Sequence, residues 1–160
     1  MQPLPCARSP QTTRTAKSTE ERERYYGAMA AALDPALAEL TLPISLSDET
    51  VPQEALRLVP GVAHGGEQPE LAWKFAREHM PQLLARTEEF TRNFYVPVIM
   101  SAFGDAAHAD ELEQYVRENS PKGMTKAKEI AEGMRLASAI RDRELPGIDN
   151  WIAAKNQPVQ

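Results

Sequence analysis

Several residue types and patterns on which common functions depend are scarce in this sequence. Its 160 residues include one cysteine, Cys6, and three histidines, so we expect no internal disulfide and no cysteine metal cluster. No apolar run approaches the roughly 18 residues needed to cross a bilayer. The first 18 residues also lack the continuous apolar stretch of a signal peptide. We therefore expect a cytoplasmic protein that does not contact membranes.

Long stretches of one charge sign are missing as well. The chain has 18 Lys and Arg against 23 Asp and Glu, a formal net charge of −5, and the two signs are mostly interleaved. A phosphate backbone is bound through a basic face, which this distribution does not offer. We expect no nucleic-acid partner. The sequence also contains no phosphate-binding loop and no nucleophile with a recognisable base partner.

The histidines do not occur at the spacing of paired metal ligands. Glu78 and His79 are adjacent, but the zinc motif HExxH places its Glu after the first His and adds a second His, an order and spacing that these residues do not follow. We expect His64, His79 and His108 at the surface or at helix ends. The sequence thus predicts no catalytic, cofactor-binding or metal-ligating residue in this chain.

Composition divides the chain into three parts. Residues 1–17 combine Pro3, Pro5 and Pro10 with Ser, Thr and Arg and almost no large apolar groups. Such a mixture cannot offset the entropy lost on ordering, so we expect a flexible leader over residues 1–17, a helical-repeat domain over 18–156 and a tail over 157–160. A chain of this size can bury roughly 70% of its unfolded surface in one domain.

Helix starts are marked by capping residues and prolines. Ser18 and Glu21 have the spacing of a capping box, and Asp34 precedes Pro35, which suits the first helical position because proline has no N–H. Further starts are predicted at Pro52, Pro69 and Ser120–Pro121, and Gly65–Gly66 is expected to end the helix that begins at Pro52.

Four other prolines are expected to interrupt helices, because proline removes a backbone donor and clashes with the preceding turn. Pro60 should distort or end its helix, and helices should restart at Pro81 and near Pro97. Pro146 should start a last helix that carries Ile148, Trp151 and Ile152.

The fold class predicted is all-α, since β-branched residues never alternate with polar ones over more than a few positions. About eight or nine short helices with short Pro- or Gly-marked connections favour stacked antiparallel pairs. This is the arrangement of a HEAT- or armadillo-like α-solenoid with degenerate repeats.

Aromatic residues beside apolar helix positions are usually core residues, so we expect Trp73 and Phe75, with Ala72, Ala76 and Met80 around them, to join helices and not to line a ligand pocket. Tyr25, Tyr26 and Trp151 could instead face another polypeptide. The alternating charges of Glu20–Arg24 and Arg141–Glu144 indicate solvated helix faces.

Three segments together resemble the C-terminal helical domain of the aminopeptidase N type of zinc aminopeptidases. They are STEERERYYGAMAAALDPALAELTL, LSDETVPQEALRLVPGVA and ELAWKFAREHMPQLLAR. The AWKF aromatic pair and the ALDPALA junction are their most specific elements. With looser similarity in the closing helices, the resemblance covers about residues 16–155.

The resemblance implies a non-catalytic, HEAT-like domain that packs on a catalytic domain and encloses the peptide-substrate chamber. The family's HExxH and GxMEN motifs are absent from this chain, so zinc is expected only in that separate catalytic domain. The partners implied are the catalytic domain, in cis or in trans, and a peptide substrate. The alternative is a free-standing α-solenoid adaptor that binds a protein or peptide on its concave face.

Overall fold

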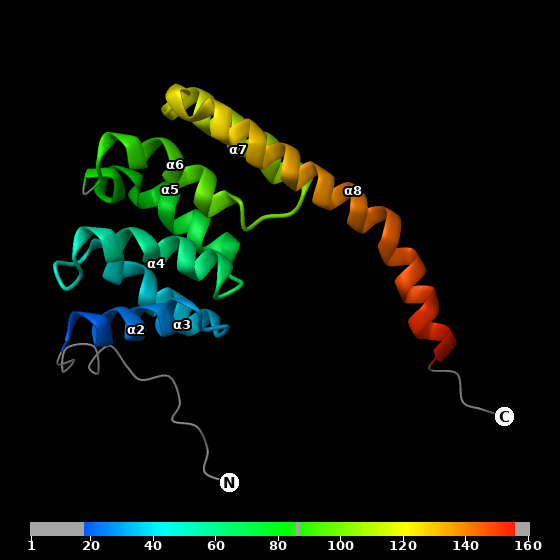
Figure 1. Ribbon diagram of the computed structural model, residues 1–160, viewed down its shortest axis with the longest axis horizontal. Coiled ribbons are helices and arrows are strands. Elements are labelled where there is room, and N and C mark those ends of the chain that lie inside the picture. The colour runs from blue at the N-terminus through cyan, green and yellow to red at the C-terminus, as the bar shows by residue number, and fades with distance from the viewer. Residues whose placement is uncertain (1–17, 86, 156–160) are drawn as a thin grey trace, which may run out of the picture. The chain divides into compact units, whose positions relative to one another are not determined.

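The computed structural model describes residues 18–85 and 87–155, so Cys6, the predicted leader and the predicted tail lie outside the described residues. These residues form helices and turns without a strand (Figure 1), which confirms the all-α prediction. The chain divides between Ala102 and Phe103 into two compact units, and each unit is described by itself. The solenoid arrangement, which concerns stacking along the whole chain, stays a prediction.

The first unit contains five α-helices and one 3₁₀ helix within its described residues. They are α2 (Thr19–Ala30), α3 (Pro35–Thr41), the 3₁₀ helix η1 (Leu42–Leu46), α4 (Pro52–His64), α5 (Pro69–Ala85) and α6 (Glu89–Met100). The second unit contains α7 (Ala106–Asn119), the short 3₁₀ helix η2 (Pro121–Gly123) and α8 (Met124–Lys155).

The predicted helix starts are largely confirmed. The Ser18 hydroxyl accepts a hydrogen bond from the Glu21 N–H at 3.1 Å, and the Asp34 carboxylate accepts one from the Ala36 N–H at 2.9 Å. Helices α3, α4 and α5 each begin at a proline, where no intrahelical donor is lost. The start predicted at Ser120–Pro121 is displaced, because Pro121 opens η2 and α8 begins at Met124.

The predicted helix end at Pro60, the restarts at Pro81 and near Pro97 and the start at Pro146 are wrong, whereas a distortion at Pro60 stays a prediction. Pro60, Pro81, Pro97 and Pro146 lie inside α4, α5, α6 and α8. An internal proline costs about 3 kcal/mol locally, but buried residues on both sides of the first three hold those helices in place: Val59 and Val62, Met80 and Leu83, Val96 and Ile99. Burial does not explain Pro146, whose neighbours are exposed; α8 curves in its C-terminal part (Figure 1).

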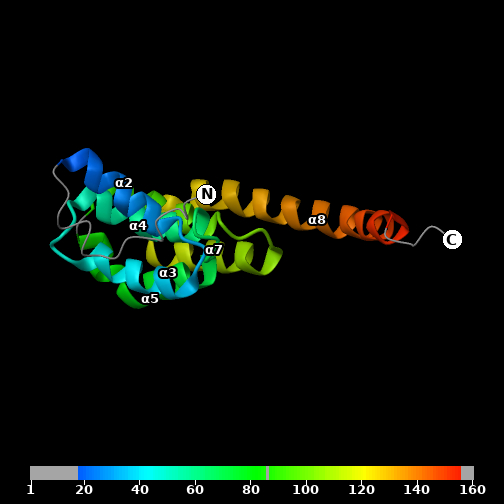
Figure 2. The same ribbon diagram turned by 90° about the horizontal axis from the view of Figure 1, so that it is seen from below.

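Helices of the first unit form two layers, which are visible in Figure 2, where α2 and α4 lie on one side and α3 and α5 on the other. Helix α4 contacts both α2 and α6. The Tyr26 hydroxyl donates to the Glu49 carbonyl before α4 at 3.4 Å, and Ala30 and Ala31 lie against Gly61 and Gly65. Helices α2 and α4 therefore run in the same direction.

Glycines in this unit serve close packing. A Cβ atom at Gly61 would lie 2.8 Å from the Ala30 Cβ, and one at Gly66 would lie 2.8 Å from the Ala30 carbonyl oxygen. Helix α4 ends at His64, as predicted, yet neither Gly65 nor Gly66 has a positive φ; the left-handed residue of this turn is Glu67, with φ of 54°. The glycines are needed here for space.

Trp73 anchors the core of the first unit. Its side chain is 2% exposed, and Phe75 is half-buried with its ring 4.6 Å from that of His79. The core prediction is confirmed for Trp73, Ala72, Ala76 and Met80. The core further includes Val59, Val62, Ile99 and Met100.

In the second unit, α7 and α8 form a helical hairpin across the short η2 connection. Its buried residues follow helical spacing on both helices: Ala109, Leu112 and Val116 on α7, and Ala127, Ala131 and Met134 on α8. Helix α8 has 32 residues and α7 has 14, so α8 continues well past its partner.

The contact between Gly61 and Ala30 is testable by adding a single methyl group. We expect Gly61→Ala to lower the free energy of unfolding by about 1–3 kcal/mol, because the new Cβ would overlap Ala30. Gly27→Ala is the matched control. A Cβ there meets nothing within 4 Å, and removing a helix-interior glycine should stabilise by about 0.5–1 kcal/mol. If urea unfolding gave the same change in the free energy of unfolding for Gly61→Ala and Gly27→Ala, the close contact between Gly61 and Ala30 would be contradicted.

The two tryptophans provide a second comparison. Trp73→Ala should destabilise the chain by about 3–5 kcal/mol through loss of buried area and formation of a cavity. Trp151 is 64% exposed, so Trp151→Ala should change stability by no more than about 0.5 kcal/mol. Thermal unfolding followed by circular dichroism measures both variants, and the reverse order would place the wrong tryptophan in the core.

Candidate functional site

The prediction of no catalytic, cofactor-binding or metal-ligating residue directs attention to the three histidines and to the cavities. Within residues 18–85 and 87–155, no group of three or more His, Cys, Asp and Glu side chains could hold a metal ion.

His64, the last residue of α4, lies near a serine in the manner of a catalytic pair. Its Nε2 is 2.9 Å from the Val98 carbonyl oxygen and 3.3 Å from the Ser101 Oγ, and that hydroxyl also donates to the Val98 carbonyl at 2.8 Å. A carbonyl only accepts, so Nε2 carries a proton and cannot remove one from Ser101. His64 instead ties the C-terminal ends of α4 and α6 together.

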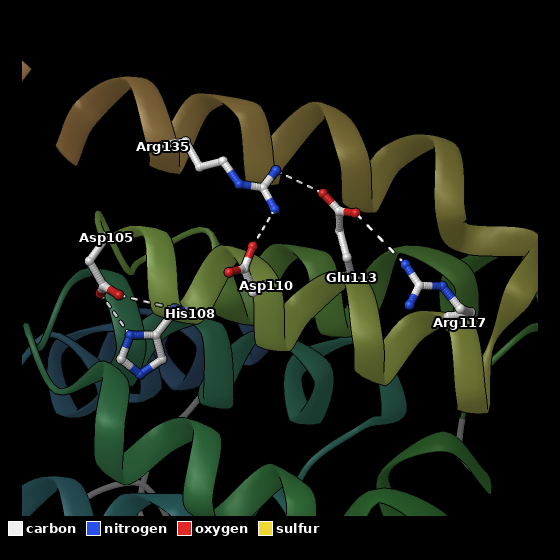
Figure 3. A network of polar contacts seen from close by, with 6 residues as sticks. All are labelled: Asp105, His108, Asp110, Glu113, Arg117 and Arg135. Carbon is white, nitrogen blue, oxygen red and sulfur yellow. Dashed lines mark hydrogen bonds and ion pairs between the residues drawn. The ribbon is translucent and has the colours of Figure 1, made fainter. Parts of the chain in front are cut away.

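His108 lies at the start of α7 and forms part of a helix cap (Figure 3). One oxygen of Asp105 accepts from the His108 N–H at 3.0 Å, and the other lies 2.7 Å from the imidazole Nδ1. The Phe103 ring stacks on this imidazole with centroids 3.8 Å apart. Both oxygens of Asp105 hold the first turn, so this Asp–His pair stabilises the fold.

The pKa of Asp105 reflects opposing causes. Desolvation would raise it, but hydrogen bonds from the amide and the imidazole of His108, attraction to the His108 charge and a further bond from the Ala107 amide outweigh this effect and lower the pKa. The ionised carboxylate is thus the form that the folded chain prefers.

A polar network joins α7 to α8 (Figure 3). The Arg135 guanidinium contacts Asp110 at 2.6 Å and Glu113 at 2.8 Å, and Glu113 also lies 4.0 Å from Arg117. Arg141 donates to the Gly104 carbonyl. Exposed ion pairs contribute little stability, so this network chiefly specifies how the two helices are aligned.

His79 differs from the expectation of a surface or helix-end residue. It lies inside α5, is half-buried, and its Nδ1 is buried without a hydrogen-bond partner among the described residues. The Tyr95 hydroxyl on α6 is likewise buried without a partner there, and desolvation raises the pKa of this phenol. Glu78 and His79 do not match HExxH, and Tyr95 lies at no motif, so sequence patterns do not reveal these two unpartnered groups.

A groove lies between α4 and α6, with a volume of about 490 Å³. Its walls are mainly apolar, and Gln53, Arg57 and Thr91 supply polar groups. The apolar part includes Leu56, Pro60, Phe94, Tyr95 and Val98.

A smaller cavity, here named the α2/α4 cavity, lies between α2 and α4, with a volume of about 270 Å³. Glycines and alanines form much of its wall, while two glutamates and one arginine provide charge. The side chains that matter chemically are Glu23, Tyr26, Glu54 and Arg57. Sequence reasoning missed Glu23, Glu54 and Arg57 as site residues and considered Tyr26 only as a possible contact with another polypeptide. Small residues at helical spacing in both segments are nevertheless a sign of close helix approach.

The three aromatic residues that could face another polypeptide, Tyr25, Tyr26 and Trp151, differ in their exposure. Tyr26 is 4% exposed and belongs to the core of its own unit, and the half-buried Tyr25 donates to Glu21 at 2.8 Å. Trp151 is exposed together with other large apolar side chains of α8: Leu136, Ile140, Leu145, Ile148 and Ile152. Of the three aromatic residues, only Trp151 offers a large apolar surface to a partner.

The charged runs behave as solvated faces. Arg24 pairs with Glu20 at 2.5 Å with both side chains 75% exposed, and Arg143 pairs with Glu144 at 2.7 Å. Among the described residues, no helix combines the length and the apolar character that a bilayer span requires.

Comparison with known sequences gives two findings. The family model described as the ERAP1-like C-terminal domain matches residues 11–135. Aminopeptidase M1 of Arabidopsis thaliana is 28% identical over 110 residues, which cover 68% of this chain and 12% of that relative. The chain therefore spans a small part of the length of this relative.

The Asp105 cap predicts a specific pH dependence. The folded pKa lies below the unfolded value of about 3.9, so its stabilisation is present above that value and is lost as the pH falls through the folded pKa. Asp105→Asn keeps an acceptor for the helix N-terminus but cannot ionise. Its stability deficit relative to the parent chain should shrink below about pH 4, measured by urea unfolding at several pH values.

Asp105→Ala serves as the comparison, because it removes the cap itself. We expect a loss of about 0.5–2 kcal/mol at pH 7. If the deficit of Asp105→Asn stayed constant from pH 7 to about pH 3, ionisation of Asp105 would not contribute to stability.

Proposed function

Because this chain belongs to the ERAP1-like C-terminal domain family, we propose that it is the accessory, non-catalytic helical module of a zinc aminopeptidase. In this proposal it packs on a catalytic domain and forms part of the wall of the peptide-substrate chamber. The family match over residues 11–135 is the observation that carries the proposal. The resemblance inferred from the sequence is thus confirmed at the level of the family.

The chemistry of the described residues supports a non-catalytic role. The pair that resembles a Ser–His dyad is tied to the Val98 carbonyl, and the Asp–His pair caps α7. The described residues also offer no group of metal ligands. In the proposal, the catalytic domain holds zinc, the reacting carbonyl and the peptide's free amine. This chain encloses the peptide substrate and helps to position it.

Packing on another domain needs an apolar surface, and α8 has one. Six of its large apolar side chains are 44% to 64% exposed: Leu136, Ile140, Leu145, Ile148, Trp151 and Ile152. Apolar clusters of this kind commonly mark interaction sites, and Trp and Ile side chains become anchors when a partner desolvates them. We infer that the catalytic domain covers this face of α8.

Mechanistically, a wall made of packed helices restricts access by shape. Helices α2 and α4 touch through glycine and alanine, and interiors at close-packed density deform little. Such a wall would admit an extended peptide and exclude folded proteins. Residues 136–155 lie beyond the family match, so their part in the wall rests on the apolar face alone.

The proposal is tested by capturing the tagged full chain from cells that naturally express it. We expect aminopeptidase activity on leucyl-naphthylamide to be captured with it and to be abolished by a zinc chelator, whereas the purified chain alone has none. The double variant Ile148→Glu with Trp151→Glu should reduce the captured activity at least about tenfold, because charges enter the contact.

Leu40→Glu is the matched control, since Leu40 is 59% exposed on α3, and it should leave the captured activity unchanged. Zinc-dependent hydrolysis by the purified chain would contradict the division of labour. Capture of protein partners without aminopeptidase activity would favour the free-standing adaptor instead.

A further inference from the structure

Glu54 lines the α2/α4 cavity with a side chain that is mostly buried. It is 8% exposed and lines the cavity, yet its side chain makes no hydrogen bond or ion pair with the residues that the structure describes. Its position in the first turn of α4 favours the negative charge of Glu54 through the helix dipole. A cation in the cavity would therefore meet a carboxylate whose acceptor oxygens are not already used by the described residues.

The walls of the cavity suit a thin aliphatic chain. Gly27 and Ala30 on α2, together with the C-cap residue Ala31, line the cavity with Gly61 on α4 and its C-cap residue Gly65. Methyl groups and backbone therefore form much of the lining. At Gly27 an added Cβ would meet nothing within 4 Å, which means that this side is open. A volume of about 270 Å³ lies below the roughly 300–1,000 Å³ of sites for drug-sized ligands. It suits a single side chain.

The charges around the cavity favour a cation. Glu23 and Glu54 contribute two negative charges and Arg57 one positive charge, so the lining carries a net charge of −1. Neither Glu23 nor Arg57 forms an ion pair with another described residue. The aromatic ring of Tyr26 also lines the cavity, and aromatic faces attract cations.

The geometry points to the α2/α4 cavity as a binding site for a lysine side chain presented by another polypeptide. The four methylene groups of lysine would lie along the glycine and alanine walls, and the ammonium group would donate to the carboxylates of Glu54 and Glu23. An ammonium is compact and has three donors, whereas a guanidinium needs a planar, two-pronged acceptor. Two carboxylates are too few for a metal site of the kind sought among the described residues.

This site stands independently of the proposed function. Lysine binding can be measured on the full chain alone, whether or not the chain packs on a peptidase. A failure of the capture experiment would leave this site untouched, and absence of lysine binding would leave the family-based function untouched.

The experiment titrates N-acetyl-lysine methylamide into the ¹⁵N-labelled full chain and follows backbone amide shifts. Glycine amides form a separate group in such spectra and report on the cavity directly. We expect saturable shifts at Gly27, Gly61 and Gly65, but not at Gly104, Gly133 and Gly147. N-acetyl-norleucine methylamide, which has the same chain without the ammonium group, should not bind. Cadaverine tests whether a free diamine suffices, and the arginine analogue should bind more weakly.

Three variants of the cavity and one control variant separate binding from folding. Glu54→Gln keeps the shape and should weaken lysine binding at least about tenfold, the effect of losing a charged acceptor. Arg57→Gln should tighten binding about two- to fivefold, because it removes the opposing charge at high effective dielectric. Gly27→Leu should fill the cavity and abolish binding, while Gly133→Leu, at another helix glycine with no neighbour within 4 Å, should bind as the parent chain does.

Equal binding of the lysine and norleucine compounds would overturn the proposal. So would parent-like affinity in Glu54→Gln, or shifts spread over glycines outside the cavity. If cadaverine bound at least tenfold more tightly than the lysine compound, a free diamine would replace a polypeptide as the ligand. Because Glu54→Gln and Arg57→Gln change charge at nearly constant shape, their opposite effects remain decisive even if Gly27→Leu failed to fold.

Discussion

Close packing of α2 against α4 is the constraint on which the first unit depends. The Gly61 position leaves 2.8 Å between its missing Cβ and the Ala30 Cβ, and the Gly66 position leaves the same distance to the Ala30 carbonyl. Only glycine allows such an approach. With α2 and α4 held together, α3 and α5 form the opposite layer, and the Trp73 side chain is buried in the same unit.

The same packing generates the α2/α4 cavity. Small residues bring the helix backbones together, and because they lack side-chain volume they leave open space beside Gly27, where the two glutamates and Arg57 gather. Stability and recognition therefore have a common origin in this unit. A larger residue at Gly61 would force the helices apart, whereas a larger residue at Gly27 would only occupy the cavity.

In the second unit, only part of the apolar surface of α8 is covered. Helix α7 covers Ala127, Ala131 and Met134 of α8, but the later part of α8 exposes Leu145, Ile148 and Ile152. In the proposed function, this uncovered apolar face of α8 is the surface that contacts the catalytic domain.

Polar clusters in this chain illustrate why residue identity alone does not define a site. A histidine beside a serine, and an aspartate beside a histidine, are common parts of catalytic centres. Here the first pair satisfies the Val98 carbonyl at the end of α6, and the second satisfies the first turn of α7. Each is explained by the backbone groups that a helix end leaves without partners.

The sequence by itself determined what local chemistry controls: the all-α class, the caps at Ser18 and Asp34, the starts at Pro35, Pro52 and Pro69, and the core role of Trp73. Caps and helical periodicity depend on neighbours within one or two turns, and these can be read directly. Tertiary structure decided whether Pro60, Pro81 and Pro97 interrupted their helices, because buried contacts on both sides outweighed the local cost of each proline. It also decided that Glu54 and Glu23 line one cavity. These residues are 31 positions apart, and only the packing of two helices brings them together.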